Sequence, residues 1–359
     1  MNKFRKVYTF DDVCLVPQFN NIASRTIPNL ESWITKNTKV GQPLIPANMD
    51  TVISDELADK MIENNSFPIF HRFTSHENQL KWVKKYNNKC YISCGVNCKM
   101  DNLKDLFDNG ARGVCIDIAH GHSITTIDLI KQLKTNFPEK EVIAGNVCSV
   151  MGYSDLVNAG ADCVKVGIGP GSACTTRKVT GFGVSQFSAI YDIASVAKKL
   201  KVPIIADGGI KSSRDVVLAL AAGASTCMIG GLFSKTYESA GNKYLKEYLK
   251  EGFVNYKEIN KEDIYKYINK GEDIYTHYRG QASENFQKDY YGSMKEGTVA
   301  EGINFYSKCN YSTDELLNNI LGGLRSGLTY GGAKNIKELQ RKAEFVEITN
   351  SYMGDLNSK

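Results

Sequence analysis

The sequence predicts an α/β protein whose main part is a single (β/α)8 barrel. Short apolar runs recur along the chain, segments with helical periodicity separate them, and polar or glycine residues follow most of the runs. This alternation is typical of a parallel sheet covered by helices. The eight runs span residues 43–49, 68–73, 90–96, 113–119, 141–147, 163–169, 203–210 and 225–233.

The segments between the runs carry apolar residues at the i, i+3, i+4 spacing of an amphipathic helix. Several end at glycine or asparagine, which favour the end of a helix. An open, doubly wound sheet is the alternative, but no strand is followed by a GxGxxG turn that opens a helix, so the barrel is favoured. The expected helices span 55–64, 77–86, 102–109, 123–137, 152–159, 185–200 and 213–222.

Length and composition fit one globular domain over residues 1–359, with 42% hydrophobic and 23% charged residues. No apolar window approaches the length of a membrane span, and residues 1–6 lack the apolar run of a signal peptide. Ten cysteines without a secretion signal indicate reduced thiols and a cytoplasmic protein. The spacing of Cys90, Cys94 and Cys98 matches no common zinc pattern. The net charge of +5 suits a small anion and is too diffuse to indicate nucleic-acid binding.

The barrel core is expected at about 43–240, after a lead-in with a short extended element at 9–17. Residues 242–273 are rich in Lys, Glu and Tyr and have helical spacing with low apolar content. We expect them to form a solvated insertion after the eighth strand, because they offer little apolar surface to a core.

A polar, glycine-containing flap at about 280–310 is predicted to be mobile over the mouth of the barrel. The C-terminal region 312–350 is expected to be helical, with one helix at 312–321 and another at 335–345. The glycine-rich stretch 322–327 would separate them.

The stretch 162–183 carries the strongest chemical signal. Its strand ends in the glycine turn 169–172, which allows a close approach to a ligand. Cys174, Thr176 and Arg177 follow at once. A thiol on a glycine loop beside a cation is a favourable place for a reactive cysteine, although a small buried cysteine is the plain alternative.

Two glycine pairs close the last two strands of the predicted barrel, Gly208-Gly209 and Gly230-Gly231. Barrels often bind phosphate at this position through bare backbone N–H groups. Each pair alone would be only a tight turn, but the two together predict a phosphate site.

Seven stretches, in order along the chain, resemble the IMP dehydrogenase/GMP reductase barrels. The resemblance runs from residue 9 to about 350 and implies a nucleotide-binding oxidoreductase. The shared stretches are TFDDVCLVP (9–17), PANMDTV (46–52), IDIAHGHS (116–123), IAGNV (143–147), KVGIGPGSACTTR (165–177), IADGGI (205–210) and GGLRSG (322–327).

Within that family the chain resembles GMP reductase more than IMP dehydrogenase. The helix at 77–86 follows residue 73 almost directly, which leaves no room for the CBS modules that most dehydrogenases insert there. The flap reads KDYY at 288–291, without the Arg-Tyr pair of dehydrogenases, and the tail 350–359 lacks their paired histidines. A dehydrogenase without CBS modules, oxidising IMP with NAD, stays an alternative, and a catalytically silent scaffold barrel is another.

The resemblance implies reduction of GMP to IMP and ammonia with NADPH, through a covalent bond between Cys174 and C2 of the purine. Thr176 and Glu301 would move protons to the leaving ammonia. Asp207 would bind the ribose hydroxyls, while Gln281 stands where the family usually has Met. The nucleotide would be held by Ser172, Asp207, Gly208, Gly209, Gly230, Gly231, Tyr278, Gly280, Gln281 and Ala282.

The same resemblance implies a cofactor site, a cation site and an assembly. A monovalent cation, K⁺, would be bound by the backbone carbonyls of Gly169, Gly171 and Cys174, and the chain would form a homotetramer. The insertion is longer than is usual in reductases, and Thr298 replaces an arginine that several reductases carry. NADPH would lie near Ser24, Arg25, Arg72, Asp117, Ile118, Ala119 and Asn146.

Overall fold

The computed structural model describes residues 4–249, 253–294 and 296–349. Outside the described residues lie 1–3 at the start of the chain, 250–252 of the insertion, 295 of the flap and the tail 350–359. All eight predicted barrel strands are present. They are β4 (Leu44–Pro46), β5 (Ile69–Phe70), β6 (Tyr91–Cys94), β7 (Gly113–Asp117), β8 (Glu141–Val147), β9 (Cys163–Val166), β10 (Ile204–Asp207) and β11 (Thr226–Ile229).

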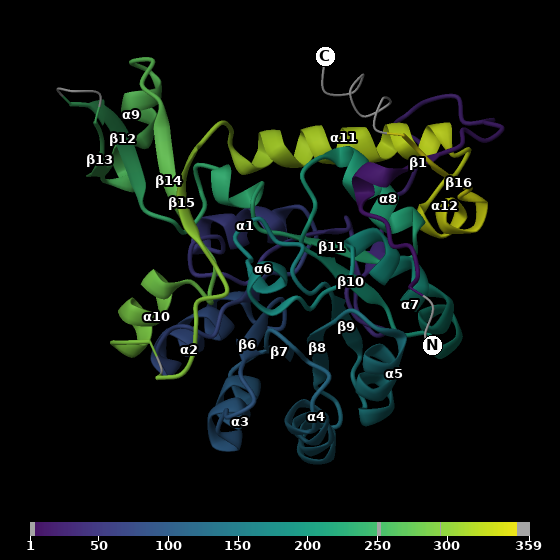
Figure 1. Ribbon diagram of the computed structural model, residues 1–359, viewed down its shortest axis with the longest axis horizontal. Coiled ribbons are helices and arrows are strands. Elements are labelled where there is room, and N and C mark those ends of the chain that lie inside the picture. Colours follow the sequence, from purple (N-terminus) through teal and green to yellow (C-terminus); the bar gives the residue numbers. More distant parts are fainter. Residues whose placement is uncertain (1–3, 250–252, 295, 350–359) are drawn as a thin grey trace.

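These strands form one parallel sheet in the order β4-β11-β10-β9-β8-β7-β6-β5. The first strand, β4, pairs with the last, β11, so the sheet curls round on itself. The predicted (β/α)8 barrel is thus confirmed, and helices lie around its outside (Figure 1).

The predicted helices between the strands are also present. Serine begins five of them, since Ser54, Ser75, Ser123, Ser149 and Ser212 each accept a hydrogen bond from the backbone N–H three residues on. No helix within the described residues is long and apolar enough to cross a membrane. The helices are α1 (Asp55–Glu63), α2 (His76–Tyr86), α3 (Met100–Asp108), α4 (Ile124–Asn136), α5 (Val150–Ala159), α7 (Gln186–Leu200) and α8 (Ser213–Ala221).

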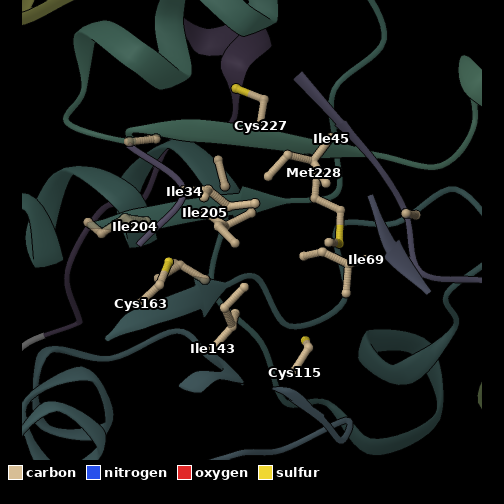
Figure 2. Close-up of a cluster of buried hydrophobic side chains, with 14 of the residues drawn as sticks. Ile34, Ile45, Ile69, Cys115, Ile143, Cys163, Ile204, Ile205, Cys227 and Met228 are labelled. Carbon is tan, nitrogen blue, oxygen red and sulfur yellow. The ribbon is translucent and has the colours of Figure 1, made fainter. Parts of the chain in front are cut away.

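Apolar side chains from the strands fill the inside of the barrel. Figure 2 shows Ile45, Ile69, Ile143 and Ile205 in one cluster with sulfur-containing side chains of other strands, and each of these isoleucines is 0% exposed. Burial raises the pKa of Cys115 to about 12, so its thiol is neutral and packs as a small apolar group. All ten cysteines are free thiols, as predicted.

One predicted break in the C-terminal region is wrong. The helix α11 (Thr313–Tyr330) runs through the glycine-rich stretch without interruption. The glycines instead let α11 approach α8 closely: a Cβ at Gly323 would overlap Ser213, and one at Gly327 would lie 2.6 Å from Val217. Burial of α11 against α8 thus outweighs the low helix propensity of glycine.

The helix expected at 335–345 is shorter in the structure. α12 (Ile336–Lys342) ends early, and β16 (Phe345–Glu347) follows as a strand. The reason is a partner from the other end of the chain: β16 pairs antiparallel with β1 (Val13–Leu15), which follows the short helix η1 (Phe10–Asp12). A second short pair, β2 (Ser32–Trp33) and β3 (Lys39–Val40), precedes the barrel.

The helical spacing of residues 242–273 does not correspond to helix over most of the described part of this insertion. β12 (Lys243–Tyr248) and β13 (Val254–Ile259) form a hairpin, and among the described residues of this stretch only η4 (Lys261–Asp263) and α9 (Ile264–Ile268) are helical. The hairpin forms because β14 (Ile274–Arg279), next in the chain, offers β12 an edge to pair with.

A four-stranded antiparallel sheet, β13-β12-β14-β15, therefore stands beside the barrel (Figure 1). Its last strand, β15 (Asn304–Lys308), belongs to the predicted flap, as does the helix α10 (Glu284–Tyr291). Tyrosines link its strands: Tyr256 stacks on Tyr306 with ring centroids 4.0 Å apart, and Tyr244 meets the same ring edge-on at 5.0 Å. Such cross-strand aromatic pairs stabilise sheets.

Lys243 is buried in this sheet, and no carboxylate among the described residues pairs with it. It is 0% exposed, and its ammonium donates to the carbonyl of Ser239 at 3.1 Å and to the Ser239 hydroxyl at 2.6 Å. Burial lowers the pKa of Lys243 to about 8, because the surroundings stabilise the charged amine less than water does.

The two neighbouring glycines of α11 give a matched prediction. Gly322→Ala should stabilise the protein by about 0.5–1 kcal/mol, since a Cβ there meets no atom within 4 Å and alanine favours a helix. Gly323→Ala should destabilise it by about 1–3 kcal/mol through overlap with Ser213. Urea unfolding measures both, and a loss of stability in the first variant equal to that in the second would refute the close α8–α11 contact.

Lys243→Met should stabilise the protein at neutral pH, by up to about 3 kcal/mol. The pKa of Lys243 is lower in the folded state (about 8) than in the unfolded chain, so wild-type stability falls as the pH drops from the unfolded pKa of about 10.4 to the folded one. Urea unfolding at about pH 7 and pH 10 should show the gain shrinking by about 2 kcal/mol at the higher pH. Lys257→Met, on the exposed face of β13, is the control, and a pH-independent gain would contradict the assignment.

Candidate functional site

The inward-facing positions of the barrel change from apolar to charged at the carboxyl ends of three strands. Successive side chains of a strand point to opposite faces, so residues two apart share a face. Cys115, Cys163 and Ile205 face the core in Figure 2. The residues two positions on are Asp117, Lys165 and Asp207.

Lys165 joins these ends of the strands through a buried ion-pair cluster. Its side chain is 2% exposed, and its ammonium lies 2.9 Å from Oδ1 of Asp117 and 3.2 Å from Oδ2 of Asp207. Burial lowers the pKa of Lys165, but the two carboxylates more than offset this and hold the pKa above its usual value. For Asp117 the two effects have the opposite signs. Burial raises the pKa of its carboxyl group, but the Lys165 ammonium more than offsets this, so the pKa lies below its ordinary value.

A bulge in β8 adds Asn146 to the cluster. The pairing register shifts between Gly145 and Val147, which turns the intervening side chain. The Asn146 amide donates to Oδ2 of Asp207 and to the carbonyl of Gly167, both at 2.8 Å. Gly145 is required here, because a Cβ would lie 2.7 Å from the Cβ of Lys165.

The predicted cysteine loop follows β9 and ends in the short helix α6 (Thr176–Thr180). Arg177 holds it in shape: its Nε donates to the carbonyl of Ile168 at 3.2 Å and its Nη2 to that of Val184 at 2.6 Å. Gly169 has φ +81 and faces this arginine, so a side chain there would be strained. The guanidinium is thus bonded to the loop backbone.

The three residues predicted to be catalytic form a continuous chain of hydrogen bonds. The Cys174 thiol lies 3.2 Å from Oγ1 of Thr176, and the Thr176 hydroxyl donates to Oε2 of Glu301 at 2.7 Å. All three side chains are partly buried. This arrangement links a nucleophile to a carboxylate through one hydroxyl, which suits proton transfer next to the thiol.

The flap segment just before β15 reaches this position through backbone hydrogen bonds to the cysteine loop. The N–H of Thr175 donates to the carbonyl of Glu301 at 2.9 Å, and the N–H of Ile303 donates to the carbonyl of Ala173 at 2.9 Å. Gly302 has no room for a side chain, since a Cβ would lie 3.0 Å from the backbone nitrogen of Ser283. The backbone therefore fixes Glu301 beside Thr176.

The start of the flap is joined to the barrel by Arg279. Its guanidinium donates to Oδ2 of Asp50, from Nη2 at 2.6 Å, and to Oδ2 of Asp289 at 2.5 Å. Two residues on, the Gln281 side chain donates to the carbonyl of Asn48 at 2.8 Å. The aromatic ring of Phe73 meets Phe286 of α10 edge-on at 4.5 Å, so the flap helix packs on the loop after β5.

A cavity of about 390 Å³ lies beside these loops. It is lined by most of the predicted nucleotide-binding residues: Ser172, Asp207, Gly208, Gly209, Gly230, Gly231 and Tyr278. A Cβ at Gly230 would lie 2.5 Å from the Tyr278 hydroxyl, which explains the glycine, and burial raises the pKa of Tyr278 to about 12. Gly280, Gln281 and Ala282 do not line the cavity. A larger cavity of about 450 Å³ elsewhere is lined by none of the predicted site residues.

Residues 7–357 match the IMP dehydrogenase / GMP reductase domain. A GMP reductase from Staphylococcus carnosus is 35% identical, over 98% of this chain and 99% of that protein. An inosine-5'-monophosphate dehydrogenase from Borreliella burgdorferi is 32% identical, over 98% of this chain and 96% of that protein. A dehydrogenase of the same name from Aquifex aeolicus is 43% identical, over 74% of this chain and 53% of that protein. The chain belongs to the IMP dehydrogenase / GMP reductase family.

Proteins named for either of the two activities match this member of the family at similar identity. The comparisons therefore establish the family without separating its reductases from its dehydrogenases.

Part of the predicted cofactor site is brought together. Asp117 and Asn146 belong to the cluster around Lys165, and the charge of Arg72 helps to lower the pKa of Asp117. Nε of Arg72 and Oδ1 of Asn146 are buried without a hydrogen-bond partner among the described residues. An unpaired buried donor on Arg72 and an unpaired buried acceptor on Asn146 fit a ligand that offers both an anionic group and an amide.

The N-terminal part of the predicted cofactor site lies apart from these residues. Ser24 and Arg25 are exposed, and the segment around them follows the end of α11: Gln18 donates to the carbonyl of Tyr330 at 2.9 Å, and Asn29 to that of Lys334 at 2.8 Å. No hydrogen bond or ion pair among the described residues joins Ser24 or Arg25 to Asp117.

Three lysines at the site were not predicted from the sequence. Lys165 lies inside an apolar strand, and a lone cation in such a run was the available signal. Lys211 and Lys235 line the cavity together with the two glycine pairs. Each lysine follows one of the pairs within a few residues, and this position in the sequence could have indicated them.

Lys165→Met should cost about 3–5 kcal/mol of stability, because two buried carboxylates would lose their counter-charge. Adding Asp117→Asn should recover at least about 1 kcal/mol of that loss, since one of the uncompensated charges is removed. Urea unfolding of both single variants and the double variant measures this coupling. Lys81→Met, an exposed partner of Glu77, should change stability by less than about 0.5 kcal/mol, and strictly additive effects at the first pair would contradict the cluster.

Proposed function

We propose that the protein is a GMP reductase, which converts GMP to IMP and ammonia with NADPH as reductant. The observation that carries the proposal is the hydrogen-bonded chain from Cys174 through Thr176 to Glu301. It puts a proton-transfer path beside the thiol, where the exocyclic amine of GMP would leave.

The thiolate of Cys174 would attack C2 of the purine, forming a C–S bond. Glu301, through the Thr176 hydroxyl, would deliver a proton to the amine, which leaves as ammonia and gives a thioimidate on the cysteine. NADPH, when bound, supplies the hydride that C2 then accepts. The C–S bond breaks as IMP forms, and Cys174 regains its thiolate.

The cavity supports a nucleotide in this orientation. Asp207 directly precedes the first glycine pair and lines the cavity, where it would accept hydrogen bonds from the ribose hydroxyls. The 5'-phosphate would lie against Gly208, Gly209, Gly230 and Gly231, with the Ser172 and Tyr278 hydroxyls beside it. Gln281 is bonded to the carbonyl of Asn48 and would meet the base from the flap.

The cofactor would lie on the other side of the cysteine loop. Arg72 offers an unpaired donor to an anionic group, and Asn146 an unpaired acceptor to the carboxamide. Asp117, Ile118 and Ala119 would complete this surface. Arg279 and the aromatic packing of α10 would hold the flap against it.

The flap favours a reductase over an IMP dehydrogenase. Where dehydrogenases carry an Arg-Tyr pair that activates water, this chain has the last turn of α10. Lys288 there pairs with Glu284 at 2.6 Å, and Tyr290 packs edge-on against Phe73 at 5.3 Å. This part of the flap therefore lacks an arginine that could activate water. Release of ammonia by a reductase fits it better than the hydrolysis step of a dehydrogenase.

Three further features belong to the proposal. K⁺ would bind the carbonyls of Gly169, Gly171 and Cys174; the Gly171 carbonyl also accepts the N–H of Cys174 at 3.0 Å, which leaves its second lone pair for a cation. The enzyme would be a cytoplasmic homotetramer.

The test is the absorbance of reduced nicotinamide in potassium buffer. With GMP and NADPH the signal should fall as ammonia appears. A rise with IMP and NAD, and no change with GMP, would instead make the protein a dehydrogenase. Silence in both reactions would favour a scaffold barrel and overturn the proposal.

Thr176→Val and Glu301→Gln should each lower kcat by about 10²-fold, because each interrupts the same proton path. The double variant should be little worse than the more damaged single variant. Glu296→Gln, an exposed flap carboxylate, is the matched control and should keep its kcat. Multiplicative losses in the double variant would show that the two residues act separately.

A further inference from the structure

The cavity beside the cysteine loop carries more positive charge than its glycine pairs require. Lys211 follows the first pair and Lys235 follows the second, and both line the cavity together with Ser172, Ser234 and Ser307. Backbone N–H groups at the glycine pairs already offer hydrogen-bond donors to a phosphate. The two lysines add positive charge to a site that has these donors without them.

Lys235 is held at the cavity wall by its backbone. It ends the short helix η2 (Phe233–Lys235), its N–H donates to the carbonyl of Leu232, and its own carbonyl accepts the N–H of Asn310, both at 3.2 Å. The hydrogen bond from Asn310 ties it to the loop that follows β15. The lysine is therefore fixed between the barrel and the antiparallel sheet.

The two lysines differ in their surroundings. The Lys211 side chain is 77% exposed, and its ammonium lies 3.9 Å from Oδ2 of Asp11. Lys235 is half-buried, and no carboxylate within the described residues lies at ion-pair distance from it. Asp207, the acidic residue of the cavity wall, is already paired with Lys165 and Asn146. Lys235 is thus a half-buried lysine without a counter-charge in the described part of the chain.

We propose that Lys235 is a specificity residue that supplies the counter-charge for the doubly negative 5'-phosphate of the substrate. The inference rests on the proposed function, because the ligand is taken to be a nucleoside 5'-monophosphate. The charge of a half-buried lysine interacts with an anion more strongly than that of an exposed lysine, since less water screens the pair. Lys235 therefore contributes more to affinity than Lys211, and contributes most for the ligand with the larger negative charge.

The experiment compares two ligands that differ by one charge on the phosphate. Isothermal titration calorimetry of the full chain measures the Kd of IMP and of its 5'-phosphate methyl ester, which keeps a single negative charge. Lys235→Met should weaken IMP about tenfold and the ester about threefold, so that the preference for IMP falls. Lys235→Arg should restore most of the preference, and Lys211→Met should change either Kd by no more than about threefold.

Controls separate charge from folding. Lys199→Met removes one exposed lysine of α7 and should leave both Kd values unchanged. Lys235→Gln keeps a polar side chain and replaces the methionine variant in the experiment if that variant folds poorly. It should show the same loss of preference for IMP. Equal weakening of both ligands, or no weakening of either, would overturn the inference while leaving the proposed function standing. Failure of the unaltered protein to bind IMP or GMP would overturn both.

Discussion

The buried ammonium of Lys165 is the constraint on which the site depends. Because its side chain is only 2% exposed, this ammonium needs a counter-charge. Asp117 at the end of β7 and Asp207 at the end of β10 supply it. The cluster fixes the carboxyl ends of β7, β9 and β10 relative to one another. It also holds Asp207 at the cavity wall while the cysteine loop leaves β9 a few residues further on. One charge thereby sets the geometry between the cavity wall and the cysteine loop.

The other half of the site comes from the antiparallel sheet. Its strand β14 brings Tyr278 to the cavity and Arg279 to Asp50, and the segment that leads into β15 places Glu301 beside Thr176. The insertion contributes indirectly, because β12 pairs with residues 274–276 of β14. We infer that the insertion, which the sequence alone left without a role, stabilises the strand that carries these contacts.

The barrel and the Cys–Thr–Glu chain could be predicted because their signals are local or carried by a family motif. The hairpin at 243–259 and the unbroken α11 could not, since each depends on a partner distant in sequence: β14 for the hairpin and α8 for the glycines of α11. Lys165 was missed for a similar reason. A lysine in an apolar run becomes interpretable only when two carboxylates are seen beside it.

The most direct test of a nucleophilic Cys174 is mass spectrometry of protein quenched in acid during turnover of GMP with NADPH. A covalent thioimidate predicts that the peptide carrying Cys174 gains the mass of GMP less that of ammonia, and that Cys174→Ala abolishes the adduct while GMP still binds. Turnover of GMP with that peptide unmodified, or undiminished turnover by the alanine variant, would contradict attack by the thiol at C2.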